Sequence, residues 1–366
     1  MIGVESIRIA LVFYQSGENA TLSYQHGWPR AFAQSPLFDC TSINLAGLTF
    51  VNRLAVTRRL HTGRFDAIVL LHSVFSNQQN LRDALFWGLA ACRVPKAYFI
   101  GNEYKLMPEK INFCQRLGIS LLVTQSSDDR VLALYREALG CCVVCIPNTG
   151  VDEKVFRPIV TSDERPIDIG YRSHPSTWYL GNNEKTEIAD YFIRNAEAYS
   201  LKTDISISPQ DRFDADGYAS FLNSCRGQIG TEPGGDYFEL TDCSRKRVNN
   251  YMATHRDAGW PEIKRLFFEN YGPSVPMRII SGRQVEAAAC KNVQILLHGK
   301  YNGYFHPDEH YIALEKDFSN AGDAIEKFRD LDFCRKLTDN AYDVVMSKLT
   351  YGCLLASFAT SLKYVL

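Results

Sequence analysis

The sequence lacks the charge surplus and the long apolar runs that would mark a nucleic-acid-binding or a membrane-spanning protein. Its 366 residues include 40 Lys and Arg against 41 Asp and Glu, a formal net charge of -1. Broad capture of nucleic acid needs a concentrated basic surface, and a membrane-spanning helix needs about 20 consecutive apolar residues. The stretch that comes closest, residues 351–366, is interrupted by Ser357, Thr360, Ser361 and Lys363. We therefore expect no nucleic-acid partner and no transmembrane segment, and leave peripheral membrane contact open.

The cysteine spacing does not indicate a disulfide framework, and we interpret the start of the sequence as a first strand and not as an export signal. The 11 cysteines are an odd number without regular spacing, and Cys141, Cys142 and Cys145 lie in the apolar run CCVVCIPN. We expect such cysteines to act as small buried hydrophobic residues and not as metal ligands or redox groups. The start, MIGVESIRIALVFYQ, carries an acidic residue where an export signal carries basic ones. These features predict a reducing compartment and a cytoplasmic location.

Neither a G-x-G-x-x-G fingerprint nor a Walker A loop occurs in the chain, which argues against a dehydrogenase and an NTPase. What the sequence does contain is an alternation of short apolar runs with segments of helical spacing. In the first part, the apolar runs lie at residues 7–14, 65–73, 96–103, 120–125 and 141–148. Continuous apolar runs of this kind predict the strands of a parallel sheet that helices cover on both faces.

A turn-rich segment, IPNTGVDEKVFRPIVTSDERP, interrupts this alternation, which then resumes with IDIGYRS, KTDISIS, GQIGTE, VQILLHG and HYIALE as expected strands. We therefore expect two Rossmann-like domains, at residues 1–150 and 151–349, with a helical insertion at 236–278. A C-terminal helix at 350–366 is expected to pack back on the N-terminal domain. The predicted fold class is α/β, with the two domains facing across a cleft at the carboxyl ends of their strands.

Four segments resemble the GT-B glycosyltransferases, in particular the large retaining group with an E-A-x-A-C-G helix and its bacterial polysaccharide and spore-coat-type members. IPNTGVDEKVFRP is similar to the interdomain signature of that group, and IDIGYRS places an arginine after the first strand of the second domain. IGTEPGG resembles the strand-end E-G-F-G segment, and VEAAACKN resembles E-A-x-A-C-G with Lys291 in place of glycine. The resemblance is strong over residues 146–329 and only architectural before them.

The resemblance implies roles for two glutamates. Glu286 would accept charge-assisted hydrogen bonds from the ribose hydroxyls of a donor nucleotide, and the alternative is a solvated helix glutamate. The family's other glutamate normally lies two helical turns earlier, where this sequence has Arg278. We infer that Glu232, in GTEPGG, is that catalytic glutamate beside the donor sugar, and that the insertion at 236–278 separates it from Glu286.

The resemblance also implies a nucleotide-sugar site in which cations of the second domain neutralise the leaving diphosphate without a metal cofactor. The candidate cations are Arg172 and Lys185, and Arg283 is either a third one or the partner of a nearby acid. Other candidates for this site are Gly234, Gly235, Tyr301 and Asn302. The two glycines would allow close approach of the ligand because they have no Cβ. A tight surface turn at EPGG and a hairpin-like connection at GKYNGYF are the alternatives.

The first domain is expected to hold the acceptor. His72 and Glu103 follow predicted strands, and both are candidates for catalytic contact with the acceptor or the donor sugar; the alternative is that they are satisfied buried groups. Tyr24, His26 and Trp28 follow the first strand in a polar and aromatic segment. These three rings could stack on a sugar, or they could belong to a disordered loop.

The predicted function is a metal-independent hexosyltransferase that moves a sugar from a nucleotide-diphosphate-sugar donor to a saccharide-type acceptor, with retention, in glycan or polysaccharide biosynthesis. A metal site is not expected at HPDEH, because Pro307 breaks the helix that two histidine ligands would need. A nucleotide-sugar epimerase and a phosphorylase on the same fold are alternatives. A non-catalytic domain that binds nucleotide sugar or glycan in an assembly complex is another, because Arg278 and Pro233 depart from the family pattern.

Overall fold

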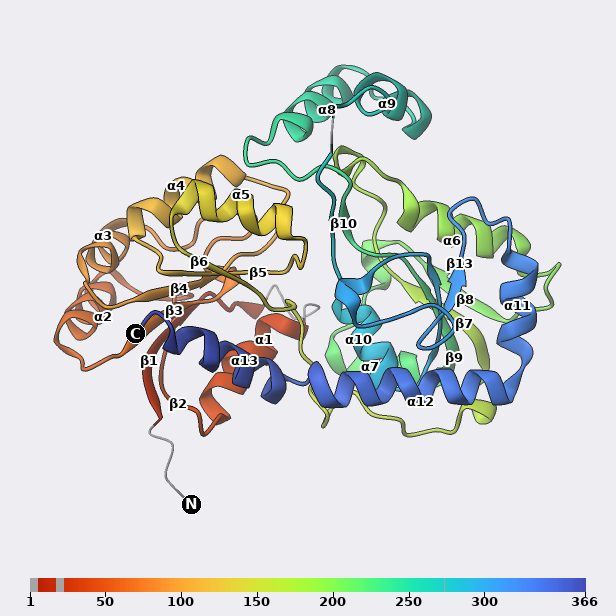
Figure 1. Cartoon of the computed structure of the whole chain (residues 1–366), viewed down its shortest axis with the longest axis horizontal. Helices are drawn as coiled ribbons and strands as arrows, with labels where there is room; N and C mark the ends of the chain where they lie inside the picture. Colours follow the sequence, from red (N-terminus) through yellow and green to blue (C-terminus); the bar gives the residue numbers. More distant parts are fainter. Residues whose placement is uncertain (1–5, 18–22, 273) are drawn as a thin grey trace. The chain divides into compact units, whose positions relative to one another are not determined.

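The computed structural model in Figure 1 describes residues 6–17, 23–272 and 274–366. The chain divides into two compact units. Unit 1 comprises Met1–Asn148, Phe238–Cys243 and Tyr351–Leu366, and unit 2 comprises Thr149–Tyr237 and Ser244–Thr350. The sequence prediction placed the domain boundary after residue 150, and in the structure unit 2 begins at Thr149.

Unit 1 is built on a parallel sheet, which in the described residues has six strands in the order β2-β1-β3-β4-β5-β6. The strands are β1 (Ile7–Phe13), β2 (Phe38–Asn44), β3 (Ala67–Leu70), β4 (Lys96–Phe99), β5 (Leu121–Thr124) and β6 (Cys142–Cys145). The helices are α1 (Ser23–Gln34), α2 (Phe50–Thr62), η2 (His72–Val74), α3 (Asp83–Ala91), α4 (Met107–Leu117), α5 (Asp129–Leu139) and α13 (Tyr351–Lys363). The predicted parallel sheet with covering helices is confirmed.

Strand β2 is an edge strand that the sequence analysis did not predict. Only Phe38 and Ile43 are buried along its seven residues. Because most of its side chains are not fully covered, its sequence FDCTSIN has no continuous apolar run. The signal used for the central strands is therefore absent here.

Unit 2 contains a second parallel sheet, with five strands in the described residues in the order β13-β12-β9-β7-β8. They are β7 (Ile167–Arg172), β8 (Thr203–Ser206), β9 (Cys225–Gly230), β12 (Val293–Leu297) and β13 (Ile312–Leu314). The α-helices are α6 (Glu184–Asn195), α7 (Ala215–Ser224), α8 (Cys243–Thr254), α9 (Trp260–Phe267), α10 (Gly282–Ala289), α11 (Ala321–Arg329) and α12 (Leu331–Lys348). Short 3-10 helices are η3 (Ser162–Glu164), η4 (Trp178–Leu180), η5 (Pro209–Asp211) and η6 (Tyr301–Gly303). Figure 1 shows helices on both faces of this sheet.

The segment between residues 236 and 278 does not continue the alternation of strands and helices. Two short strands pair where the segment begins and ends. β10 (Gly234–Gly235) pairs antiparallel with β11 (Met277–Arg278). Helices α8 and α9 share a small core around Val248, Ile263 and Phe268. Not all of this segment belongs to the second domain as predicted, because Phe238–Cys243 is part of unit 1.

The short segment Phe238–Cys243 contacts α4 and α5 within unit 1. The Asp242 carboxylate accepts hydrogen bonds from the backbone N–H groups of Leu106 (2.7 Å) and Met107 (3.1 Å), where α4 begins. Orphan N–H groups at a helix start need such an acceptor. Tyr135 of α5 also packs against Phe238, with ring centroids 5.3 Å apart.

Helix α13 packs within unit 1, which confirms the prediction that the C-terminal helix packs back on the N-terminal domain. A Cβ on Gly27 of α1 would lie 2.1 Å from the Tyr351 hydroxyl, so α1 and α13 meet where only a glycine fits. Further along, the Phe358 ring lies 4.9 Å from Phe99 and 5.6 Å from Phe32. In the described residues, no helix has the length and hydropathy required to cross a bilayer.

We expect Phe358→Ala to lower the free energy of unfolding by about 3–5 kcal/mol, because it removes a fully buried aromatic ring and leaves a cavity. Leu366→Ala is the matched control, since Leu366 is exposed in the same terminal segment. Urea denaturation followed by circular dichroism measures both. A loss below about 1 kcal/mol for Phe358→Ala would show that α13 is not part of the core of unit 1.

Candidate functional site

Two cations and a histidine lie close together in unit 2. His174 follows the carboxyl end of β7, Lys185 lies in the first turn of α6, and Arg283 lies in the first turn of α10. Both cations lower the pKa of His174 to about 4, together with burial, which is the larger cause. Two separate elements, α6 and α10, therefore bring positive charge to one place, beside an imidazole that is neutral near pH 7.

The cluster has more positive charge than its own acids neutralise. Burial lowers the pKa of Lys185 to about 7, and repulsion from Arg283, Arg278 and Arg212 adds to the effect, while Glu184 opposes it. Within the described part of the chain, neither Lys185 nor Arg283 makes a hydrogen bond or an ion pair. Neighbouring like charges that are partly buried and lack partners are unfavourable unless an anion binds between them, so their presence points to an anion-binding site.

The start of α10 is fixed by its own side chains. Ser281 and Gln284 form a capping box, in which the Ser281 N–H donates to Gln284 Oε1 over 3.0 Å. The Gln284 side chain donates to the Thr231 carbonyl oxygen over 3.1 Å, which ties the helix to the end of β9. Arg283 thus projects from a rigid turn whose N–H groups add partial positive charge.

Glu286 lies one turn further along α10 and is only 4% exposed. This burial excludes the alternative of a solvated helix glutamate. Burial raises the pKa of Tyr218 on α7, and Glu286 raises it further while Arg283 lowers it. Glu286, Arg283 and Tyr218 are therefore neighbours.

The carboxylate of Glu232 is occupied by the loop that follows β12. It accepts hydrogen bonds from the backbone N–H groups of Tyr301 and Lys300. A Cβ on Gly299 would lie 2.4 Å from Glu232 Oε2, so the loop passes too close for any other residue. Burial raises the pKa of Glu232, and the two N–H groups offset part of that effect. Glu232 therefore positions the loop.

Arg278 joins three parts of this region. Its guanidinium binds both oxygens of Glu184 (2.8 and 3.0 Å), and it also binds Asp236 Oδ1 (2.7 Å) and the Glu232 carbonyl oxygen (2.9 Å). Lys316 adds an ion pair to Glu184 at 2.7 Å. Burial opposes the charge on Glu184, but Arg278 and Lys316 outweigh it and leave the pKa of that carboxyl below its ordinary value.

Arg172 does not join the cation cluster. Its Nη2 pairs with Asp204 Oδ1 at 2.7 Å, and its Nη1 donates to the Asp204 carbonyl oxygen. The guanidinium also lies 4.4 Å from the ring centroid of Phe221. The sequence prediction overlooked that Arg172 and Tyr171 point to opposite faces of β7, because side chains alternate along a strand. We therefore leave Arg172 out of the proposed site.

Four other predicted ligand residues are engaged in the backbone framework. Gly234 has a φ of +107°, and a Cβ there would meet the Met277 carbonyl oxygen at 1.9 Å. Gly235 lies against Leu180. Tyr301 is fully buried, and the Asn302 side chain accepts a hydrogen bond from the Ile280 N–H at 2.6 Å. These residues shape the loops around the cluster, and the hairpin-like alternative for GKYNGYF is replaced by η6.

In unit 1, Glu103 and His72 are both buried but differ in their partners. Glu103 accepts hydrogen bonds from Thr124 Oγ1 (2.5 Å), the Tyr135 hydroxyl (2.6 Å) and the Gln125 N–H (2.9 Å). It is thus satisfied, although burial raises its pKa. Neither ring nitrogen of His72 has a partner in the described residues, and burial lowers the pKa of His72 to about 3.

The aromatic segment near the first strand forms α1 instead of a loop. Trp28 is fully buried, and its Nε1 donates to the Asn148 carbonyl oxygen at 2.6 Å. The ring of His26 meets the Gln15 side chain. Tyr24 lies 4.7 Å from the His72 ring. Trp28 therefore belongs to the core and is no stacking platform for a sugar.

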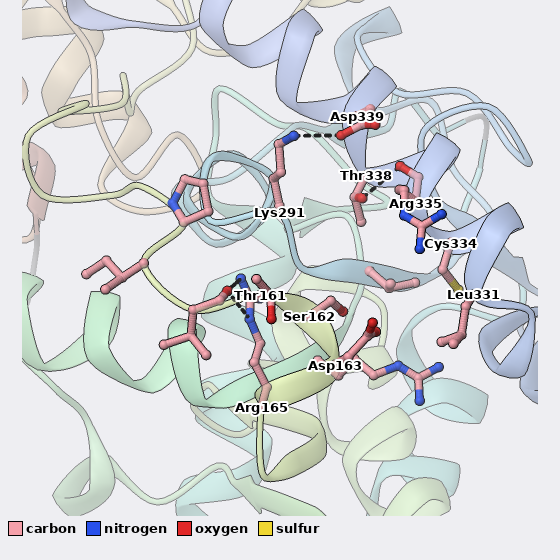
Figure 2. Close-up of a pocket in the computed structure, with 15 residues that line it drawn as sticks. Thr161, Ser162, Asp163, Arg165, Lys291, Leu331, Cys334, Arg335, Thr338 and Asp339 are labelled. Carbon is pink, nitrogen blue, oxygen red and sulfur yellow. Dashed lines mark hydrogen bonds and ion pairs between the residues drawn. The ribbon is translucent and has the colours of Figure 1, made fainter.

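A cavity of about 580 Å³ opens at the opposite, amino end of the strands in unit 2 (Figure 2). None of the predicted site residues lines it. Its cations are already used: Lys291 pairs with Asp339 at 2.6 Å, as Figure 2 shows, and Arg165 donates to the Val160 and Cys290 carbonyl oxygens. Lys291 has a φ of +54°, which explains why glycine is preferred at this position in the resembling family.

The histidines of HPDEH contact each other and part of the backbone. His310 Nδ1 accepts a hydrogen bond from the His306 N–H at 3.1 Å, and the two rings are 5.5 Å apart. Among the described residues, no group of three or more His, Cys, Asp or Glu is arranged to hold a metal ion.

Sequence reasoning missed His174, Arg212, Tyr218 and Glu184. His174 stands two residues after Arg172 in the same strand-end segment, so the position after the strand is the signal that could have drawn attention to it. Arg212 and Tyr218 come from η5, α7 and their connection, and only the fold brings them near Arg283. No sequence pattern marks them.

No protein-family model matches the chain, and no curated protein matches it. Solved structures do share its fold. A sucrose-phosphate synthase from Thermosynechococcus elongatus aligns over 98% of this chain and 99% of its own at 13% identity, with a TM-score of 0.54.

Two further structures align with 98% of this chain and all of their own. Anabaena HepE in complex with UDP-glucose does so at 12% identity with a TM-score of 0.54. A DNA-modifying β-glucosyltransferase does so at 10% identity with a TM-score of 0.55. The likeness shows that this chain has the α/β GT-B fold.

Arg278→Leu is expected to lower the free energy of unfolding by about 3–5 kcal/mol near neutral pH, because it leaves buried Glu184 and partly exposed Asp236 without their main partner. The control is Arg335→Leu, which removes an exposed i,i+3 ion pair and should change stability by less than about 0.5 kcal/mol. Urea denaturation measures both.

The effect of Arg278→Leu should depend on pH. The folded-state pKa of Glu184 is depressed, so its contribution is present above the unfolded pKa and is lost as pH falls through the folded pKa. The difference between variant and wild type should therefore shrink on acidification. A loss of stability that stays constant down to acid pH would contradict the assignment to this ion pair.

Proposed function

We propose that the protein is a glycosyltransferase whose unit 2 binds the diphosphate of a nucleotide-sugar donor at Lys185 and Arg283. The observation that carries the proposal is the excess of positive charge at these two partly buried side chains, which have no hydrogen bond or ion pair in the described residues. A diphosphate is the anion that fits several convergent cations beside a helix N-terminus. HepE in complex with UDP-glucose, which shares the fold, supports this choice of ligand.

The cations would do most of the chemistry that this chain supplies. Negative charge grows on the diphosphate as the sugar leaves, and fixed donors aimed at growing charge lower the barrier. Glu286 lies one turn from Arg283, and its proposed role, which comes from the sequence resemblance, is to accept hydrogen bonds from the ribose hydroxyls. Glu232 supports the loop at Gly299 and keeps it beside the site. It acts as a positioning residue.

We further propose that no metal ion is required, because the side-chain cations take its electrostatic role. Activity that survives a strong chelator supports this part, and activity that is lost with chelator and restored by a divalent cation refutes it. A saccharide-type acceptor and retention of configuration are proposed from the sequence resemblance. Analysis of the anomeric configuration of the product by NMR tests retention.

A non-catalytic nucleotide-sugar-binding domain is the second candidate, and one observation favours it. Both predicted catalytic carboxylates, Glu232 and Glu103, already accept hydrogen bonds from donors of the protein itself. Donor hydrolysis or transfer in a screen of nucleotide sugars excludes this candidate. Binding without turnover of any donor supports it.

Lys185→Gln and Arg283→Gln are each expected to weaken UDP-glucose binding roughly 10- to 100-fold, since each removes a charge-assisted contact worth about 1.5–3 kcal/mol. Lys291→Gln is the matched control, because it removes a cation of the same unit that already pairs with Asp339. Isothermal titration calorimetry measures the affinities. Equal affinity in wild type and in both variants would remove this site from the account.

Donor affinity should fall as pH rises from about 6 to about 8.5. Burial lowers the pKa of Lys185 to about 7 in the empty protein, and an anion favours its protonated form, so binding is coupled to proton uptake above that pKa. We expect a decrease of roughly tenfold for UDP-glucose, whose diester phosphates do not titrate in this range. The Lys185→Gln variant should show a flat profile, and a flat profile in the wild type would contradict the assignment.

A further inference from the structure

Unit 1 exposes large apolar side chains on two neighbouring helices. On α2, Phe50 is 70% exposed, Val51 72% and Leu54 47%, and on the adjacent α3 Trp87 is 59% exposed. Figure 1 shows the two helices side by side. We call these four residues the apolar patch. Single exposed apolar residues are common, but three within five residues of one helix, next to a helix that exposes a tryptophan, are typical of an interaction surface.

Helix α2 is well formed, so poor helix formation does not explain why its apolar side chains face outward. Thr49 caps its start by accepting a hydrogen bond from the Asn52 N–H. The helix is held against α3, where a Cβ on Gly88 would lie 2.3 Å from Thr57. Leu60 is its only buried residue among those described. Packing on the sheet therefore accounts for the inner side of α2 and leaves Phe50, Val51 and Leu54 unexplained.

The surroundings of the patch are basic. Between Asp39 and Asp66 the sequence has four arginines, at 53, 58, 59 and 64, and no Asp or Glu, although the whole chain has a net charge of -1. Arg58 and Arg59 are exposed on α2. Asp39, before this stretch, is exposed. After it, Asp66 pairs with Arg8 at 2.5 Å and Asp83 pairs with Arg53 at 3.1 Å.

Trp87 carries the same combination of an apolar face and a cation. The Arg116 guanidinium of α4 lies 4.6 Å from its ring centroid and 5.0 Å from that of Phe86. Tryptophan beside arginine is typical of residues placed at the boundary between lipid and water, where the ring enters the apolar layer and the cation stays at the headgroups.

We propose that the apolar patch and its arginines dock unit 1 on the surface of an anionic lipid bilayer. The apolar side chains would enter the interface, and Arg58, Arg59 and Arg64 would meet lipid phosphates. Charge complementarity decides this against a second copy of the chain, because two such faces would bring arginine against arginine. The proposal rests on unit 1 alone and stands independently of the proposed function.

Co-sedimentation with lipid vesicles tests the proposal, using phosphatidylcholine alone or with about one-third phosphatidylglycerol. Wild type should bind the anionic vesicles and bind neutral ones at least about tenfold more weakly, since each arginine near an anionic surface contributes about a fivefold factor. High salt should weaken the binding, because it screens the headgroup charge. Both Phe50→Ser with Leu54→Ser, and Arg58→Glu with Arg59→Glu, should abolish it.

The matched control is Ile193→Ser with Arg194→Glu, which changes an exposed isoleucine and an exposed arginine on α6 of unit 2. This variant should bind vesicles as wild type does, and thermal unfolding should show all variants folded. Wild type that stays in the supernatant with anionic vesicles overturns the proposal. A dimer in light scattering that Phe50→Ser with Leu54→Ser dissociates, or equal binding by all variants, also overturns it.

Discussion

The ion-pair network around Arg278 is the constraint on which the candidate site depends. Its guanidinium joins the start of α6 through Glu184, the base of the helical excursion through Asp236, and the end of β9 through the Glu232 carbonyl oxygen. Lys185 is the next residue of α6 after Glu184, so the same network places Lys185 near Arg283. Arg278 thus stands at a position where the resembling family has a glutamate, and in this chain it is the shared partner of two acids, Glu184 and Asp236.

Two kinds of charge are therefore separated within a small region. The acids there are matched with donors: Glu184 has Arg278 and Lys316, and Glu232 has two backbone N–H groups. The cations Lys185 and Arg283 have no hydrogen bond or ion pair within the described part of the chain. A partly buried cation without a partner destabilises the empty protein, as the depressed pKa of Lys185 indicates, and a bound anion would reverse that effect. Under the proposed function, a diphosphate would gain binding energy from this imbalance.

The sequence was sufficient for the central strands, and insufficient where tertiary folding decides. Buried strands such as β3 and β12 have continuous apolar runs, whereas β2 at the edge does not. The role of Glu286 stays a prediction, which rests on the helix pattern around it. Nothing in the sequence indicated that Arg172 pairs with Asp204, because the face of the strand, and not its end, determines where a side chain points. Arg212 and Tyr218 could not be found, since only tertiary folding brings them to Arg283.

A crystal structure of the protein with UDP-glucose tests the central claim most directly. The account predicts the diphosphate oxygens within hydrogen-bond distance, about 3 Å, of Lys185 Nζ and the Arg283 guanidinium, with the ribose beside Glu286. A diphosphate bound elsewhere, for example in the cavity lined by Arg165 and Lys291, would contradict it.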